Sequence, residues 1–90
     1  MNEKEKLYQE IIAIMDEMLE DTSIPRNIRR SLSHAKETLE DKSKDLDVRV
    51  ASAIFELDEI ANDPNIPVHG RTVVYMIMSK LETLSKMLSS

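Results

Sequence analysis

Cysteine is absent from the 90-residue sequence. Without thiols the chain can form no disulfide bond, no thiolate metal site and no cysteine nucleophile. This absence is compatible with a reducing compartment, so we expect a cytoplasmic protein. The first six residues mix acidic and basic side chains and do not resemble a signal peptide.

Turn-forming and aromatic residues are also scarce. The sequence has one glycine, three prolines and no tryptophan, and only 3% of its residues are aromatic. Few turn residues favour a small number of long elements, and the pattern lacks the short β-branched and aromatic runs of a sandwich or barrel. A glycine-rich phosphate-binding loop is excluded for the same reason.

The sequence has fewer basic than acidic residues, and it has no long apolar run. The net charge of −5 disfavours contact with the phosphates of nucleic acid or with an anionic membrane. The longest apolar run, residues 73–78, is far shorter than the ~20 residues of a membrane-spanning helix. We therefore expect no membrane association, and nucleic acid is disfavoured as a partner.

One short pattern occurs twice. Residues 20–25 have the sequence EDTSIP, and a similar sequence, NDPNIP, follows 42 positions later at residues 62–67. Proline suits the first turn of a helix, and Ser23 and Asn65, two residues before each proline, are candidate helix caps. Each copy therefore predicts the turn of a helical hairpin.

Apolar residues recur every three or four positions in four segments, which predicts helices at about residues 3–20, 25–41, 46–62 and 67–88. Short joints place consecutive helices side by side and antiparallel. We therefore predict an all-α fold with a single domain over residues 1–90, an antiparallel up-down four-helix bundle built from two helical hairpins. The second segment has the narrowest apolar stripe, so it is expected at the periphery.

Two stacked hairpins of the HEAT kind are the competing arrangement. The 42-residue offset falls in the HEAT range, and residues 47–51 resemble the second helix of such a repeat. However, that fragment lies in the third segment. The internal repeat instead makes segments two and four the second helix of each hairpin, so the two alignments conflict. Two repeats are also fewer than a solenoid usually needs. The bundle is therefore favoured.

Catalytic and metal-binding patterns are missing. The two histidines, His34 and His69, do not follow a glutamate by three positions, as the ligands of a di-metal bundle do. His34 and Glu37 are expected to form an exposed pair one turn apart. Two carboxylate groups, in residues 16–20 and 58–63, are expected on solvated helix flanks. We predict a protein that is not an enzyme and has no cofactor.

A basic cluster has two interpretations. It could contact an acidic protein segment or RNA phosphates, or its members could be structural, with Arg29 paired to Asp21 and Arg71 to Asp63. The repeated Asp–Arg spacing favours the structural interpretation, and the few aromatic residues weaken the RNA one. The residues concerned are Arg26, Arg29, Arg30 and Arg71.

The sequence has more apolar residues than one buried stripe on each helix requires. This excess is the feature that points most clearly to a binding surface. Such surface often marks a site for a partner or for a second copy, such as a homodimer, although it could instead mean that the last helix is central. The candidate residues for this surface are Val48, Phe55, Tyr75, Met76, Met78 and Met87.

The chain resembles a small uncharacterised family of archaeal proteins. The resemblance lies in residues 18–30, 47–53 and 62–67. The paired Ile-Pro turns are the specific part of this resemblance, which covers nearly the whole chain. It implies a compact helical bundle in an archaeal cytoplasm and no activity. We therefore predict a protein that acts through protein–protein interaction or self-association, with RNA contact through the arginine cluster as the alternative.

Overall fold

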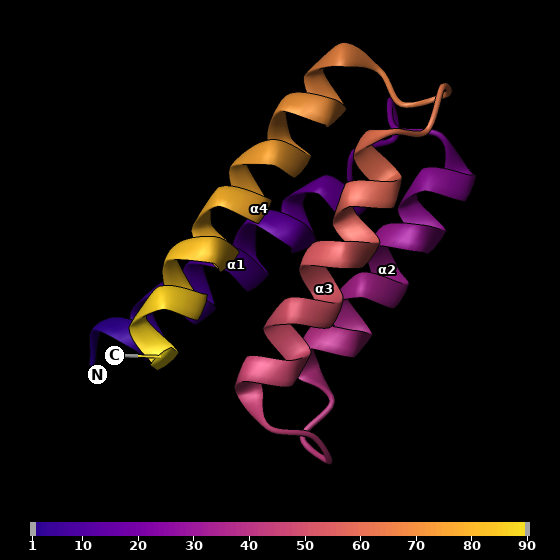
Figure 1. Ribbon diagram of the computed structural model, residues 1–90. Coiled ribbons are helices and arrows are strands. Elements are labelled where there is room, and N and C mark those ends of the chain that lie inside the picture. Colours follow the sequence, from indigo (N-terminus) through magenta and orange to yellow (C-terminus); the bar gives the residue numbers. More distant parts are fainter. Residues whose placement is uncertain (1, 90) are drawn as a thin grey trace.

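The computed structural model describes residues 2–89 and contains four helices (Figure 1). They are α1 (Glu3–Leu19), α2 (Arg26–Glu40), α3 (Leu46–Ala61) and α4 (Val68–Ser89). No strand occurs within residues 2–89, which confirms the predicted all-α class. Within that part of the chain, no helix combines the length and apolar character needed to cross a membrane.

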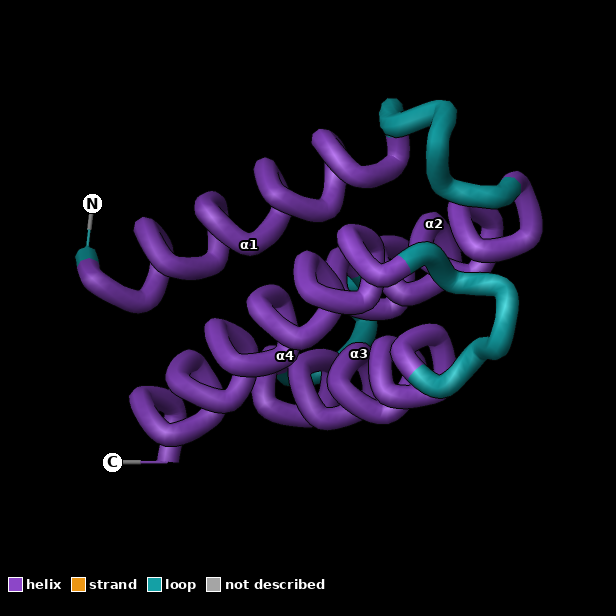
Figure 2. Tube along the Cα trace, turned by 90° about the horizontal axis from the view of Figure 1, so that it is seen from above, coloured by secondary structure: helices purple, strands orange, loops and turns teal. Residues whose placement is uncertain are grey.

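The helices form a closed ring of neighbours. α1 packs on α2, α2 on α3, α3 on α4 and α4 back on α1, whereas the two diagonal pairs make no close backbone contact. The chain reverses at every joint, and both ends of the chain lie at one end of the molecule (Figures 1 and 2). The result is the predicted antiparallel up-down bundle, about 36 Å long and 21 by 18 Å across.

A hydrophobic core runs along the centre of this ring. All four helices contribute side chains, and no polar or charged residue is buried within residues 2–89. The large side chains with less than 2% exposure include Ile11, Met15, Leu32, Leu39, Val50, Leu57, Val74, Ile77, Leu81 and Leu84. Burial of such side chains supplies the main driving force for folding.

Helix α2 is not peripheral, contrary to the expectation from its narrow stripe. Ile28, Leu32, Ala35 and Leu39 are all exposed by 1% or less. The helix packs on α3 as extensively as α4 does. A narrow but continuous stripe of apolar residues is therefore enough to pack a helix between its two neighbours.

The three interhelical loops share one aspartate-centred turn. In each loop, an aspartate Oδ1 accepts the backbone N–H of the residue two positions later, as in an Asx turn. The pairs are Asp21 with Ser23 (2.9 Å), Asp41 with Ser43 (3.1 Å) and Asp63 with Asn65 (2.8 Å). The serine hydroxyls also donate to Asp21 and Asp41, and these bonds lower the pKa of both carboxyls below the ordinary value.

These turns correct the expected helix caps. Ser23 was expected to cap α2, but its hydroxyl donates to Asp21 Oδ1 at 2.6 Å. The N-cap position of α2 is held by Pro25, and α2 has no side-chain cap. The aspartate therefore organises the loop before the helix begins.

An arginine follows each of these aspartates by eight positions. Arg29 Nε donates to the Ile24 carbonyl, Arg49 Nη1 to Leu39 and Arg71 Nε to Ala61, each at 3.0 Å. The last two acceptors lie in the final turn of a helix, where carbonyls lack helical partners and positive charge is favourable. The expected pairs of Arg29 with Asp21 and Arg71 with Asp63 are therefore wrong: the guanidinium groups bind backbone carbonyls instead.

Candidate functional site

The four arginines singled out in the sequence do not form one basic patch. Arg29 and Arg71 are half-buried and hold loop and helix-end carbonyls. Arg26 and Arg30 lie one turn apart on α2, are exposed, and form no ion pair within residues 2–89. Because α2 and α4 do not pack on each other, Arg71 is separated from these two side chains.

Large apolar side chains stand exposed on α3 and α4. Phe55 is 61% exposed, Tyr75 51%, Val48 47% and Met76 43%. Val68, which was not singled out in the sequence, is the most exposed of this group at 78%. Of the other predicted residues, Met78 is half-buried and packs against the core, and Met87 is also half-buried.

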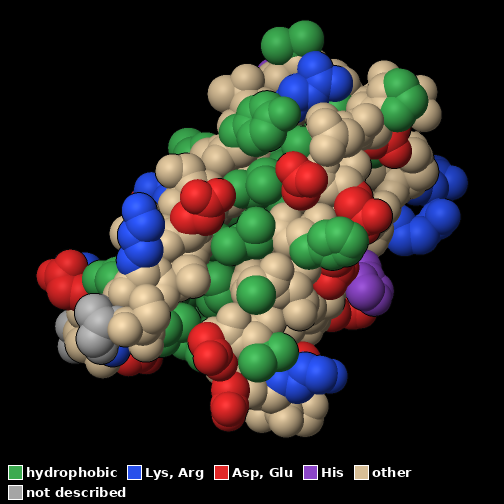
Figure 3. All heavy atoms as spheres, in the orientation of Figure 1, with side chains coloured by type: hydrophobic (Ala, Val, Ile, Leu, Met, Phe, Trp, Pro, Cys, Tyr) green, Lys and Arg blue, Asp and Glu red, His purple; other side chains and the backbone are tan. Residues whose placement is uncertain are grey.

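Four of these residues define one surface, which we call the α3–α4 face: Val48, Phe55, Val68 and Tyr75. Val48 and Phe55 are seven positions apart on α3, so they lie on one side of that helix. Arg71 lies between Val68 and Tyr75 at helical spacing, and its bond to Ala61 shows that this side of α4 turns towards α3. Figure 3 shows hydrophobic side chains in a band over α3 and α4, with acidic groups along it and basic groups near its two ends.

Met76 belongs to a different surface. With Ile14 and Met18 of α1 and Val73 of α4, it lines a shallow pocket of about 180 Å³ between α1 and α4. The predicted set of apolar residues is thus divided by the structure between two sides of α4.

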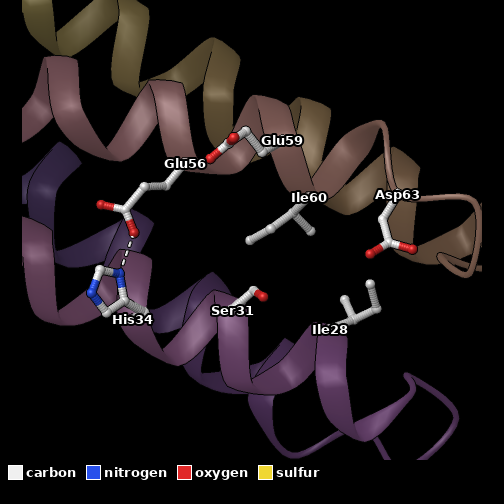
Figure 4. A pocket seen from close by; sticks show the side chains of 7 residues that line it. All are labelled: Ile28, Ser31, His34, Glu56, Glu59, Ile60 and Asp63. Carbon is white, nitrogen blue, oxygen red and sulfur yellow. Dashed lines mark hydrogen bonds and ion pairs between the residues drawn. The ribbon is translucent and has the colours of Figure 1, made fainter.

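A groove between α2 and α3 lies on the other side of α3 (Figure 4). Its volume is about 440 Å³. Ile28 and Ile60 supply apolar surface, and three carboxylates line the α3 side. The lining residues are Ile28, Ser31, His34, Glu56, Glu59, Ile60 and Asp63.

One end of this groove is closed by a hydrogen-bonded network. His34 Nδ1 lies 2.5 Å from Glu56 Oε1, and Thr38 Oγ1 donates to Glu56 Oε2 at 2.6 Å. The hydrogen bond to Glu56, together with its negative charge, raises the pKa of His34 above the ordinary value. The expected local pair of His34 with Glu37 is therefore wrong, because the imidazole binds a carboxylate of the neighbouring helix.

The second histidine links the first loop to α4. His69 Nε2 lies 2.8 Å from Ser23 Oγ and 3.6 Å from Asp21 Oδ2. Because the Ser23 hydroxyl already donates its hydrogen to Asp21, its oxygen accepts from His69. Both histidines thus join elements that are distant in the sequence.

The remaining acidic groups show no arrangement for chemistry. Within residues 2–89, no group of three or more His, Asp or Glu side chains is placed to hold a metal ion. Asp16 pairs with Lys36 at 2.6 Å and Glu10 with Lys80 at 2.7 Å, linking α1 to α2 and to α4. The feature that fits a function best is the α3–α4 face with its acidic surroundings.

Val68 and Glu56 were missed by sequence reasoning. Val68 lies one position beyond the expected start of the last helix, and its apolar character alone does not reveal its exposure. Glu56 carries no local signal, because both its partners, His34 and Thr38, lie on another helix.

Comparisons with known proteins agree with the expected kind of family. The model of an uncharacterised protein family, UPF0147, matches residues 1–84. A UPF0147 protein of Thermoplasma volcanium is 44% identical over 91% of this chain and 92% of its own. One from Pyrococcus furiosus is 41% identical over 92% of this chain and 89% of its own.

Solved structures share the fold. A crystal structure of a UPF0147 protein from Thermoplasma acidophilum superposes with a TM-score of 0.86 at 43% identity, covering 91% of this chain and 96% of that one. A second crystal structure, of a protein of unknown function, gives 0.81 at 44% identity, covering 86% and 88%. The predicted similarity to an uncharacterised archaeal family is confirmed.

Proposed function

The chain belongs to the uncharacterised protein family UPF0147, and we propose that it is a non-enzymatic protein-binding module whose α3–α4 face contacts another protein. One observation supports the proposal above all. Val48, Phe55, Val68 and Tyr75, on two adjacent helices, are each exposed by 47% or more. Grouped apolar side chains of this size on a small protein are typical of partner surfaces.

Aromatic side chains give this face its binding capacity. Phenylalanine and tyrosine bury large areas on association with little loss of side-chain entropy. Residues of this type carry a large share of the binding energy at many interfaces. Phe55 and Tyr75 are therefore the proposed anchors, and we place the interaction in the cytoplasm.

The alternative of RNA contact has less support. Arg29 and Arg71 already donate to backbone carbonyls, which leaves Arg26 and Arg30 as a pair on α2. Two arginines on a chain of net charge −5 provide little counterion release on a phosphate backbone. We therefore retain nucleic acid only as an outcome that the experiments would reveal.

Affinity capture with matched variants tests the proposal. The double variant Phe55→Ser/Tyr75→Ser removes both anchors, and Arg26→Ser/Arg30→Ser changes an equal number of exposed residues on α2. An extract of Thermoplasma acidophilum, which carries a relative 44% identical, is passed over each immobilised protein. The wild type and the arginine variant should retain a protein that the anchor variant loses.

Two outcomes would contradict the proposal. One is recovery of the same proteins by all three baits, since the α3–α4 face would then have no part in binding. The other is loss of binding, or recovery of RNA, with the arginine variant alone. Sedimentation equilibrium of the isolated chain separates partner binding from self-association, because only self-association raises the mass with concentration.

A further inference from the structure

The charges around the α3–α4 face identify the chemistry of the partner. Asp58 and Glu59 follow Phe55 by three and four positions, so all three lie side by side on α3. Glu82 follows Tyr75 by seven positions on α4 and shares its side of that helix. All three carboxylates are exposed, and none forms an ion pair within residues 2–89.

The basic groups near this face are Arg49, Arg71 and Lys86, and Arg49 donates to the Leu39 carbonyl at 3.0 Å. Arg71 is held by the Ala61 carbonyl at 3.0 Å, and Lys86 lies near the end of α4. A second copy bound through the same face would add its own Asp58, Glu59 and Glu82 to the three carboxylates already there. Such accumulation of like charge disfavours association. The electrostatics therefore favour a basic partner over a second copy.

The groove of Figure 4 adds a position for a basic side chain, and its lining residues Glu56 and Glu59 follow Phe55 by one and four positions on α3. Glu59 and Asp63 line the groove on the α3 side, and Ile28 and Ile60 provide its apolar surface. Lysine and arginine side chains bury an aliphatic stem while keeping the charged head near polar groups. A volume of about 440 Å³ accommodates such a side chain.

We propose that the segment bound by this protein is a basic amphipathic helix, which lies along α3 with apolar residues on Phe55 and a lysine or arginine in the α2–α3 groove. This inference rests on the proposed function and extends it by naming the partner's chemistry. It explains why an acidic surface and exposed apolar side chains adjoin on the same helix. Helices that carry apolar residues at every third or fourth position bind such surfaces through a few anchors.

Binding of designed peptides tests the inference. The first probe is a fluorescent leucine–lysine helix of about 18 residues, or five turns. The second replaces its lysines by glutamates, and the third replaces its leucines by glutamines. Affinities are measured by fluorescence anisotropy at about 0.15 M salt, where long-range attraction between exposed charges is screened.

Three protein variants accompany the peptides. Phe55→Ser removes the anchor, Glu59→Lys reverses a charge at the groove, and Glu20→Lys makes the same charge change at the exposed end of α1. Circular dichroism confirms the fold of each variant. Only the leucine–lysine peptide should bind well, and Phe55→Ser and Glu59→Lys should each weaken it about tenfold, or about 1.4 kcal/mol. Glu20→Lys should change the affinity less than about threefold.

The contrary outcomes separate the two proposals. If Phe55→Ser weakens binding but the leucine–glutamate peptide binds as well as the basic one, the partner chemistry is wrong and the proposed function stands. Unchanged affinity of Phe55→Ser, or equal binding of the peptide without leucines, would overturn both. Binding of none of the peptides, or equal loss with Glu20→Lys and Glu59→Lys, would overturn the inference about a basic helix.

Discussion

Gly70, the single glycine of the chain, lies in the first turn of α4 against Ile24 of the first loop. A Cβ at this position would lie 2.9 Å from Ile24 Cδ1, 3.3 Å from Ile66 Cγ1 and 3.6 Å from Met18 Cε. The first two distances are shorter than ordinary van der Waals contact. The absence of a side chain therefore permits α4 to begin against the buried ends of Ile24 and Ile66.

Two substitutions at Gly70 should separate helix propensity from packing. In Gly70→Ala, the gain of about 1 kcal/mol in helix propensity opposes the displacement of Ile24, so stability should change by no more than about 1 kcal/mol. Gly70→Val adds two methyl groups beyond the Cβ of alanine and should destabilise the fold by about 2 kcal/mol. Urea unfolding measures both values. A Gly70→Val variant as stable as the wild type would show that Ile24 and Ile66 do not confine this position.

Arg71 should contribute to folding, in contrast to Arg30. Arg71→Met removes a charged donor from the Ala61 carbonyl and should lower the free energy of unfolding by about 1 kcal/mol. Arg30→Met changes an exposed side chain that forms no ion pair within residues 2–89, and should alter stability by less than about 0.5 kcal/mol. Chemical denaturation of the two variants side by side compares these roles. The assignment fails if Arg30→Met is the more destabilising.

At the scale of the helix, α2 provides a test of how the core is shared. Leu32 is fully buried midway along this helix, so Leu32→Ala should lower the free energy of unfolding by about 3 kcal/mol. A helix at the periphery would tolerate the change with a much smaller loss. Ile77→Ala, at a fully buried position of α4, is the matched control and should cost a similar amount in the same urea titration.

The link between α2 and α3 should make stability depend on pH. Folding raises the pKa of His34 above its ordinary value of 6.5 because Glu56 accepts its hydrogen bond, with Glu37 adding a smaller contribution. A raised pKa in the folded state means that the pair stabilises the fold fully below about pH 6.5. This contribution is lost as the pH rises through the folded-state pKa.

Unfolding measured from about pH 5 to about pH 9 tests this link. The wild type should lose stability relative to His34→Gln as the pH rises above 6.5. His69→Gln, which removes the other histidine, should still lose stability above pH 6.5 as the wild type does, because His34 is unchanged. Parallel curves for the wild type and His34→Gln would show that Glu56 does not hold the imidazolium.

The helices could be predicted from the sequence because their signals are local. Apolar spacing and the two Ile-Pro turns are sufficient for four helices and an antiparallel ring. Sequence patterns predict the Asp and Arg recurrence at only two of the three joints, because residues 41–45 lack the proline that marks the other two. The turn at Asp41 is nevertheless the same as at Asp21 and Asp63.

Contacts between helices could not be read from the sequence. The spacing of Asp21 and Arg29 suggested an ion pair, but a carbonyl that lacks a helical partner competes for the same guanidinium group, and no sequence pattern shows which acceptor is nearer. The exposed residues of the α3–α4 face were singled out in part. Met78 turns inward to the core and Val68 outward, because the rotation of α4 in the ring decides which side is covered.

At the scale of the whole molecule, the ring of four helices leaves most of its exposed large apolar side chains on the α3–α4 face, with Met76 on the α1–α4 side. The core is filled by one stripe from each helix, so Phe55, Val68 and Tyr75 remain outside it. Their exposure means that substitution should affect binding much more than folding. Phe55→Ser/Tyr75→Ser should therefore change the free energy of unfolding by less than about 1 kcal/mol.

Nuclear magnetic resonance of the valine and isoleucine methyl groups locates the bound partner on this surface. The protein captured from extract is added to the labelled chain, and chemical shifts are followed at Val48 and Val68 on the α3–α4 face and at Ile12 on α1. We predict large shifts at Val48 and Val68 and none at Ile12. Shifts at Ile12 with Val48 and Val68 unchanged would contradict binding through the α3–α4 face.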